Sequence, residues 1–393
     1  MSLREWMHPG CLPIGVDIGA GSVRLLQMRR RRSGLSLVHA ARADLPVSAR
    51  EPESKERLEA LTQTVTRLLD AGGFLGRACV LSIDDRALRV RSVRHPRIPD
   101  EELERAVQLD APGRLGFAEG ESAQFGWLRA GETRQGEELR EEIIVVGARR
   151  QPIEELVFGL ASRRVQPLAV EPGFLACARS FGRLLRRAVD QSIVRAIVDI
   201  GLCTTGVILM RGRAVTFYKQ LEFGGERMTK AAAERLGMEP SAVAEMRRRR
   251  AAGGAPGDPR VDRAMFEAVR PLLCDLAQEV SLCVRYCGVT FRGARPESCL
   301  VVGGEAREPR LAEQMSEILH LPVSVGQPLH GVTPREGGGA EEVRPGNDCE
   351  WAVAAGLGLR FVEQRVWAKA DRRRGEGGEG PGETRTQPAR QAA

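Results

Sequence analysis

Residues 14–27 read IGVDIGAGSVRLLQ, a pattern that predicts two apolar strands joined by a tight glycine turn. Asp17 ends the first strand, residues 19–22 form the turn, and residues 23–28 return as the second strand. Such a turn points several backbone N–H groups into one concavity that suits anionic oxygens, and glycine allows a close approach to the backbone. Glycine turns between buried strands are also common without any ligand. This stretch alone therefore leaves a phosphate-binding turn and a plain hairpin both open.

A second copy of the pattern lies at residues 197–210, IVDIGLCTTGVILM. Asp199 matches Asp17, Gly201 matches Gly19, and the next polar residues, Thr204 and Thr205, stand near the place of Ser22. One Asp-x-Gly is weak evidence for a site, whereas a repeat at the start of each half indicates a duplicated architecture. We therefore predict two halves that face each other across a phosphate.

Size and composition indicate a soluble protein with two major lobes. A chain of 393 residues is too long for one compact core, and its 42% apolar and 28% charged residues are typical of globular proteins. No apolar run approaches the roughly 18 residues of a membrane span. The first ten residues, MSLREWMHPG, lack the apolar centre of a secretory signal. We expect a cytoplasmic protein.

The net charge of +7 raises the question of a nucleic-acid partner. Only 4% of the residues are aromatic, which leaves few platforms for base stacking. The arginine runs at 29–32, 247–250 and 372–374 fall in predicted turns, loops and the tail. Such runs are usually solvated loops, although they also favour an anionic membrane surface. We predict no nucleic-acid partner.

Apolar periodicity and breaker residues divide the chain into lobes, an insertion and two terminal segments. A helix that begins after Pro99 is followed by a polar, glycine-rich stretch and a strand at 142–147, and a further helix is expected over 173–189. We expect a mobile basic loop at 246–260, and a helix over 262–286 that is interrupted or kinked near Pro271. A loop rich in Gly and Glu is expected at 336–347.

The predicted division is an N-terminal segment 1–13, a first lobe 14–83 plus 165–196, an inserted α+β module 84–164, a second lobe 197–222 plus 296–366, a subdomain 223–295, and a disordered tail 367–393.

A third site element is Gly303-Gly304, which follows a predicted buried strand at 298–302. The two glycines leave a flat surface on which an adenosine could lie. Asp17 and Asp199 could hold Mg²⁺, mostly through its waters, or each could cap its own turn. The repetition of the two carboxylates favours the magnesium site.

These elements resemble the actin, hexokinase and DnaK-type chaperone superfamily, and the sequence is most similar to its PilM family of type IV pilus assembly proteins. The resemblance runs from residue 14 to about residue 363. The similar segments are ACVLSIDDRALRVRSVRHPRIPDEELERAV, EIIVVGARRQPIEELVFGL, VQPLAVEPGFLACAR, LEFGGERMTKAAAERLGM, CLVVGGEAREPRLAEQMSEILHLPVSV and WAVAAGLGL. The resemblance implies an α/β, actin-like (ribonuclease H-like, duplicated) two-lobed fold with an inserted small α+β subdomain.

The resemblance also implies roles for individual residues. The first phosphate loop would consist of Gly19, Ala20, Gly21, Ser22 and Val23. The second would consist of Gly201, Thr204 and Thr205. The adenosine motif would be Gly303, Gly304 and Glu305, where Glu305 replaces a residue that is more often small. Asp17 and Asp199 would hold the metal.

Two further positions carry specific expectations. Arg24 stands where the family usually has a lysine that reaches the β-phosphate; an arginine can pair with phosphate bidentately but is bulkier. Glu171 falls where related ATPases orient the attacking water, so it is the candidate base. The alternative is that Glu171-Pro172 merely begins a helix, with proline at its favoured first position.

The function implied is a cytoplasmic, ATP-binding adaptor of a type IV pilus or type II secretion-like platform, with Mg²⁺ as cofactor and at most weak ATPase activity. It would lie at the inner membrane by binding the N-terminal peptide of a PilN-like protein, beside other platform proteins. Self-association stays open. One alternative is a true ATPase or small-molecule kinase of the same fold. Another is an FtsA-like polymerising protein, although the polar tail here lacks the membrane-binding helix of that family.

Overall fold

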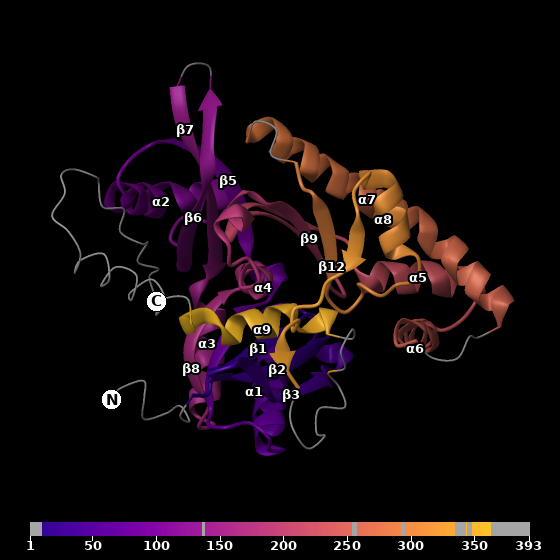
Figure 1. Cartoon of the computed structure of the whole chain (residues 1–393). Coiled ribbons are helices and arrows are strands. Elements are labelled where there is room, and N and C mark those ends of the chain that lie inside the picture. Colours follow the sequence, from indigo (N-terminus) through magenta and orange to yellow (C-terminus); the bar gives the residue numbers. More distant parts are fainter. Residues whose placement is uncertain are drawn as a thin grey trace.

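The computed structural model describes residues 10–135, 138–253, 258–291, 295–334, 343 and 348–362, which form two lobes and a smaller module (Figure 1). The predictions for most of the N-terminal segment 1–13, for most of the loop 336–347 and for the tail 367–393 lie outside these residues. Among the described helices, none is both long enough and apolar enough to cross a membrane.

The first lobe is built on a six-stranded sheet that begins with the predicted hairpin. β1 pairs antiparallel with β2 and parallel with β4, so the carboxyl ends of β1 and β4 meet at one edge. The strands lie in the order β14 (Val332–Thr333), β3 (Gly34–Asp44), β2 (Ser22–Arg31), β1 (Ile14–Ile18), β4 (Ala78–Ile83) and β8 (Gln166–Pro172).

The second lobe repeats this arrangement with a five-stranded sheet. β9 pairs antiparallel with β10 and parallel with β12, as β1 does with β2 and β4. The strands lie in the order β11 (Ala214–Leu221), β10 (Thr205–Arg211), β9 (Val194–Ile200), β12 (Ser298–Val302) and β13 (Val323–Val325). The duplication predicted from the two hairpins is therefore present in the sheet topology.

The core consists of helices on both faces of each sheet. α1 (Lys55–Asp70), which is capped by Ser54, and α3 (Arg150–Ala161) cover the outer face of the first sheet. α4 (Gly173–Gly182) and α9 (Ala352–Gly358) lie between the two sheets and share one apolar cluster with both. α9 approaches β1 so closely that a Cβ on Gly15 would lie 1.9 Å from the carbonyl oxygen of Ala354.

The outer face of the second sheet is covered by four helices in one apolar cluster. They are α5 (Gly225–Leu236), α6 (Pro240–Ala251), α7 (Pro259–Thr290) and α8 (Leu311–Leu319). Three expectations are corrected here. Residues 246–251 belong to α6 rather than to a loop, α7 continues through Pro271 instead of being interrupted, and α4 ends at Gly182 rather than near residue 189.

The inserted module is a three-stranded antiparallel sheet with one helix packed on it. Its strands are β5 (Arg89–Pro96), β7 (Glu138–Arg149) and β6 (Ala123–Gln135), and the helix is α2 (Asp100–Leu115). β6 falls in the stretch that was expected to be merely polar and glycine-rich. The alternation of apolar and polar residues along β6 is not evident in the sequence, because Gly126, Gly131 and several charged residues interrupt the apolar positions.

The end of the described chain returns to the first lobe. β14 pairs with β3 of the first sheet, and α9 with the preceding turn η4 (Cys349–Trp351) packs on β1, β2 and α4. Among the described residues, 332–333 and 351–362 therefore pack on the first lobe, whereas the predicted boundary at residue 366 put them in the second lobe. The sequence pattern of a helix does not reveal which sheet the helix covers.

Candidate functional site

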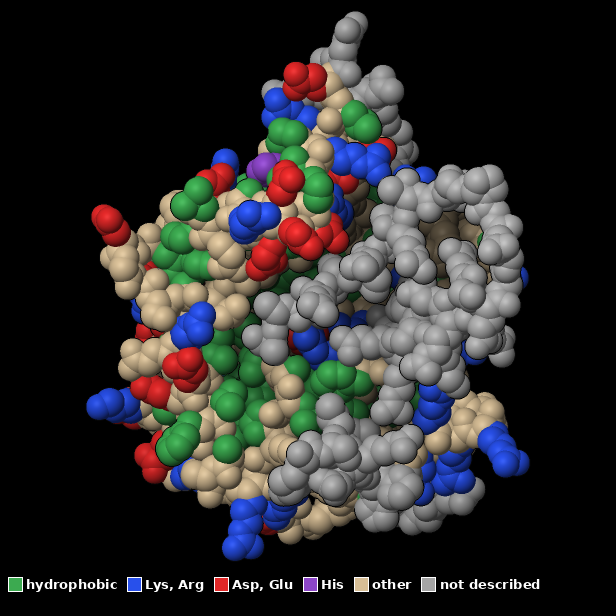
Figure 2. All heavy atoms as spheres, turned by 90° about the vertical axis from the view of Figure 1, so that its left-hand side faces the viewer, with side chains coloured by type: hydrophobic (Ala, Val, Ile, Leu, Met, Phe, Trp, Pro, Cys, Tyr) green, Lys and Arg blue, Asp and Glu red, His purple; other side chains and the backbone are tan. Residues whose placement is uncertain are grey.

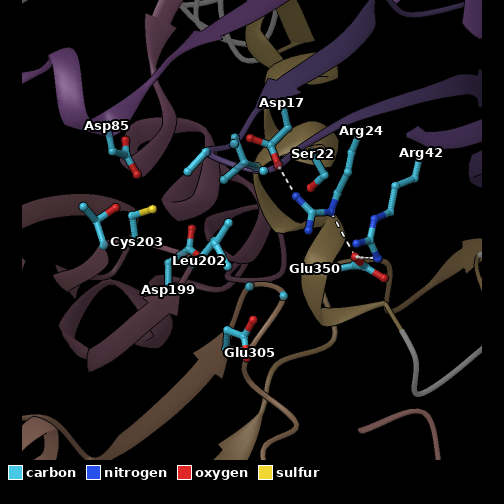
Figure 3. A pocket seen from close by; sticks show the side chains of 18 of the residues that line it. Asp17, Ser22, Arg24, Arg42, Asp85, Asp199, Leu202, Cys203, Glu305 and Glu350 are labelled. Atoms are coloured by element: carbon cyan, nitrogen blue, oxygen red, sulfur yellow. Dashed lines mark hydrogen bonds and ion pairs between the residues drawn. The ribbon is translucent and has the colours of Figure 1, made fainter. Parts of the chain in front are cut away.

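A cavity of about 560 Å³ lies between the two lobes, and the turns of both duplicated hairpins line it (Figure 3). The structure brings most of the predicted site residues together on its walls. They are Asp17, Gly19, Ala20, Gly21, Ser22, Arg24, Asp199, Gly201, Thr204, Gly303, Gly304 and Glu305.

The two turns have the same internal geometry. The N–H of Gly19 donates to the carbonyl of Ser22 at 3.0 Å, and the N–H of Gly201 donates to that of Thr204 at 2.9 Å. The turns also face each other closely, since a Cβ on Gly21 would lie 2.6 Å from Cδ2 of Leu202. The pair of turns thus forms two concave backbone surfaces on opposite sides of one cavity.

Two residues that were predicted to belong to the phosphate loops, Val23 and Thr205, lie away from the cavity. Asp17 is opposite Arg24, and Asp199 is opposite Gly206, so Val23 and Thr205 occupy equivalent positions at the start of the return strands. Neither residue lines the cavity. Val23 is buried in the core of the first lobe, and buried Thr205 donates from Oγ1 to the carbonyl of Phe223 at 2.8 Å.

Among the acidic residues that line the cavity are Asp17, Asp85 and Asp199 (Figure 3). Burial raises the pKa of Asp17, although Arg24 partly offsets this. Burial and the charge of Asp17 raise the pKa of Asp199 to about 7. Burial, with the charges of Asp199, Asp84 and Asp17, raises the pKa of Asp85 well above its ordinary value. The electrostatics of the site therefore favour the arrival of a cation or of protons.

The donor set fits a hard divalent cation that keeps its waters. One buried oxygen of Asp85, Oδ1, has no hydrogen-bond partner among the described residues, and the carboxylates are the ligand type that Mg²⁺ prefers. No three acidic, His or Cys side chains of the described residues converge closely enough to hold a metal directly. The arrangement is suited to coordination through water.

Arg24 crosses the floor of the cavity from β2. Its Nη1 donates to Oδ2 of Asp17 at 3.4 Å, and its Nε donates to Oε2 of Glu350 at 3.0 Å. Arg42 of β3, which is opposite Arg24 in the strand register, donates to the same oxygen of Glu350 at 3.1 Å. Two guanidinium groups and one carboxylate thus lie beside the first turn.

The predicted adenosine motif is held by residues that were not predicted to take part. Gly303 has φ +93°, and a Cβ there would lie 2.4 Å from the carbonyl of Ile200, so glycine is required. Arg247 of α6 is only 5% exposed and donates from Nη2 to Glu305 and Glu308, both at 2.7 Å. Glu305 is therefore paired from within the second lobe, with a side chain that is partly exposed.

Glu171, the predicted catalytic base, is not among the residues that line the cavity. It is the penultimate residue of β8, with 2% exposure, and Arg179 donates to both of its oxygens, at 2.6 and 2.9 Å. Arg360 pairs with it as well. Both oxygens are thus engaged, and the structure does not bring Glu171 together with the other site residues. Pro172 caps α4, whose first residue is Gly173.

Several cavity residues were missed by the sequence reasoning, namely Arg42, Asp84, Asp85, Arg247 and Glu350. The consecutive acids Asp84-Asp85 directly after the buried strand β4 were a usable signal, because β4 is parallel to β1 and ends at the same edge. Arg247 and Glu350 carry no such signal. Arg247 lies in a run of four arginines, and Glu350 comes near the end of the chain.

Comparison with known proteins agrees with this architecture. Similar solved structures include a PilM-PilN type IV pilus biogenesis complex (22% identity, TM-score 0.74, 90% of this chain and 99% of that one). They also include the ethanolamine utilization protein EutJ from Carboxydothermus hydrogenoformans (15% identity, TM-score 0.53, 91% of this chain and 93% of that one). A third is a MamK double helical filament (12% identity, TM-score 0.50, 90% of this chain and 98% of that one). These likenesses confirm the predicted actin-like fold.

Residues 15–362 match the family described as type IV pilus assembly protein PilM. The match spans both lobes and the inserted module, and it includes every residue of the predicted site. The chain belongs to the PilM family of type IV pilus assembly proteins.

Proposed function

We propose that this chain binds ATP with Mg²⁺ in the cavity between its lobes and serves as a cytoplasmic adaptor of a type IV pilus assembly platform. The observation that carries the nucleotide proposal is the pair of equivalent turns that face each other across one cavity, each with an aspartate beside it. Backbone N–H groups of both turns would bind phosphate oxygens, and Gly303 and Gly304 would leave room for the adenosine.

Asp17 and Asp199 are the residues that would hold the metal, mostly through water. When bound, Mg²⁺ supplies positive charge that offsets both the phosphates and these acids. Without a cation, the carboxylates would repel the phosphates, so we expect ATP binding to require a divalent ion. Arg24 would contact a phosphate oxygen if it left Glu350.

The lobes are joined at the cavity mouth by ion pairs that a nucleotide would influence. Arg50 of the first lobe pairs with Glu226 at 3.1 Å, and Asp44 pairs with Arg248 at 3.5 Å. A ligand shifts such an equilibrium only through different contacts in the open and closed states. Because the turns that would bind phosphate belong to different lobes, ATP would favour the closed state.

The partner we propose is a PilN-like inner-membrane protein, which would hold this chain at the membrane by an N-terminal cytoplasmic peptide. A PilM-PilN complex has the same fold as this chain. Partly exposed hydrophobic side chains lie on both sides of the border between the first lobe and the module: Ala169, Leu175, Val90 and Leu128. Figure 2 shows hydrophobic side chains gathered on one face of the molecule, between charged margins.

The test is a titration of the full chain with the N-terminal cytoplasmic peptide of a PilN-like protein from the same organism, with and without ATP and Mg²⁺. We expect saturable binding whose affinity changes with ATP, and a loss of affinity in Leu128→Asp. Leu282→Asp, on the exposed face of α7, is the matched control and should bind normally. Peptide affinity and protease sensitivity that do not respond to ATP would contradict the proposed coupling between nucleotide and partner binding.

Hydrolysis of ATP is a second candidate function. It is favoured by Asp85, which brings a carboxyl oxygen without a hydrogen-bond partner to the cavity and has a raised pKa. A carboxylate oxygen that faces the cavity without a hydrogen-bond partner is able to accept a proton from an attacking water. Release of phosphate that depends on Asp85 would establish this activity.

A further inference from the structure

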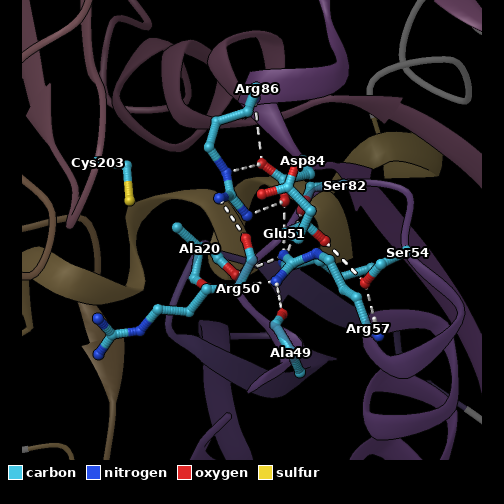
Figure 4. Close-up of polar contacts among 12 residues, drawn as sticks. Ala20, Ala49, Arg50, Glu51, Ser54, Arg57, Ser82, Asp84, Arg86 and Cys203 are labelled. Atoms are coloured by element: carbon cyan, nitrogen blue, oxygen red, sulfur yellow. Dashed lines mark hydrogen bonds and ion pairs between the residues drawn. The ribbon is translucent and has the colours of Figure 1, made fainter. Parts of the chain in front are cut away.

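Arg57 contacts the first phosphate loop and is not among the residues that line the cavity (Figure 4). It is an arginine of α1 with 2% exposure. Its Nη2 donates to the carbonyl of Gly19 at 2.9 Å, and its Nη1 donates to those of Ala20 at 3.2 Å and Ala49 at 2.9 Å. The remaining contact is an ion pair with Oδ2 of Asp84 at 2.6 Å.

These contacts fix the orientation of two peptide groups. In a trans peptide the C=O of one residue and the N–H of the next point in opposite directions, and the described chain contains no cis peptide. The carbonyls of Gly19 and Ala20 point to Arg57, so the N–H groups of Ala20 and Gly21 point away from it, toward the cavity that these residues line. Neither N–H has an acceptor among the described residues.

The second lobe provides an independent comparison. There the carbonyls of Gly201 and Leu202, the equivalents of Gly19 and Ala20, accept from the backbone N–H groups of Gly225 and Glu226 at 3.0 and 2.9 Å. The first turn of α5 is close enough to do this because residue 224 is glycine; a Cβ there would lie 2.3 Å from the carbonyl of Leu202. In the first lobe, the side chain of Arg57 donates the hydrogen bonds to the two turn carbonyls that backbone N–H groups donate in the second lobe.

We propose that Arg57 is a positioning residue that sets the first phosphate loop for its ligand. The inference rests on the proposed binding of ATP in the cavity. Only a guanidinium offers several donors in one plane, so it holds both carbonyls and Asp84 together.

Asp84 connects the contacts between Arg57 and the first phosphate loop to the inserted module. Arg57 and Arg86 both pair with it, at 2.6 and 2.8 Å, and Arg86 also donates to the carbonyl of Arg50 (Figure 4). Asp84 precedes Asp85, which faces the cavity, and the module begins here. The loop that would bind phosphate and the entry to the module are thus fixed by one network of buried and partly buried side chains.

The decisive variant is Arg57→Lys, which keeps a positive charge beside Asp84 but cannot reach both carbonyls at once. We expect its affinity for ATP to fall roughly tenfold, a loss of the size that one charge-assisted hydrogen bond gives, while its affinity for adenosine is unchanged. Arg183→Lys is the matched control, because Arg183 also donates to two backbone carbonyls, those of Pro328 and His330, away from the loop.

Equal losses for ATP and adenosine would overturn the inference, since they would indicate a general structural role. Unchanged affinity for both ligands would overturn it as well. If the native chain bound no ATP at all, the proposed function would fail, and hydrogen exchange would still test the loop. The amides of Gly19 and Leu45 donate to carbonyls of Ser22 and Gly21, so they should exchange faster in Arg57→Lys than in the native chain. Unchanged exchange there would also refute the role of Arg57.

Discussion

Arg24 donates from Nε to Oε2 of Glu350 at 3.0 Å, a contact between residues 326 positions apart in the chain. Glu350 also accepts from Arg42, so one carboxylate holds both guanidinium groups beside the first turn. A phosphate at this turn would compete with Glu350 for Arg24.

Replacing this carboxylate should therefore strengthen nucleotide binding. We expect Glu350→Gln to raise the affinity for ATP several-fold, because the competing charge is removed and a charge-assisted hydrogen bond contributes about 1.5–3 kcal/mol. Calorimetric titration measures this, with Glu313→Gln on the exposed side of α8 as control. A weaker affinity for ATP would mean instead that Glu350 orients Arg24 for the phosphate.

The raised pKa of Asp199 predicts how stability depends on pH. Its carboxyl titrates near 3.8 when exposed and at about 7 in the folded chain, so the folded state binds the proton more tightly. The contribution of this tighter proton binding to the stability of the fold is full below about pH 3.8 and is lost as the pH rises through about 7. Asp199→Asn should therefore be more stable than the native chain at about pH 8, by on the order of a few kcal/mol, and this difference should shrink toward about pH 5.

Urea unfolding without divalent ions at several pH values measures this difference. A gap between variant and native chain that stays constant with pH would contradict the raised pKa. Leu282→Asn, on the exposed face of α7, should show no such trend.

The ion pair between Arg50 and Glu226 should contribute to lobe closure. Both side chains are partly exposed, and such a pair contributes about 0.2–1 kcal/mol. We expect Arg50→Glu and Glu226→Arg each to increase protease sensitivity between the lobes, and the double exchange to restore the native pattern. If the effects of the two single exchanges on protease sensitivity simply add in the double variant, the two residues are not directly coupled.

Glu171 should stabilise the fold rather than take part in hydrolysis. Its two oxygens are engaged by Arg179 and Arg360, and breaking a buried pair costs about 3–5 kcal/mol. We expect Glu171→Gln to lower the melting temperature but to retain any phosphate release per folded molecule. Asp85→Asn should abolish that release and preserve the fold. The reverse result would restore Glu171 as the base.

The fold was largely predictable because its signal is local and repeated. Each Asp-Ile-Gly hairpin carries its own apolar alternation and glycine turn, and the repetition identified the two lobes. β6 was missed because glycines and charges interrupt its apolar positions, and α6 because a run of four arginines resembles a solvated loop. In the structure one of these four, Arg247, is buried against Glu305 and Glu308.

The candidate site was predictable where it lies on the two hairpins and on the glycines after β12. The turns at Gly19 and Gly201 are encoded by their own residues, and both line the cavity. Arg57, Arg42 and Glu350 reach it from other elements, so their contribution depends on tertiary packing that a sequence pattern does not contain. The position of Glu171 outside the cavity was hidden for the same reason, since Arg360, one of its partners, is 189 positions away.

The paired turns should bind ATP through a divalent cation held by Asp17 and Asp199. Titration of ATP into the full chain, with Mg²⁺ and with a chelator, measures this binding. We predict saturable binding with Mg²⁺ that is lost with the chelator and in Asp17→Ala/Asp199→Ala. Binding of equal strength in the double variant, or no binding by the native chain with Mg²⁺, would contradict the claim.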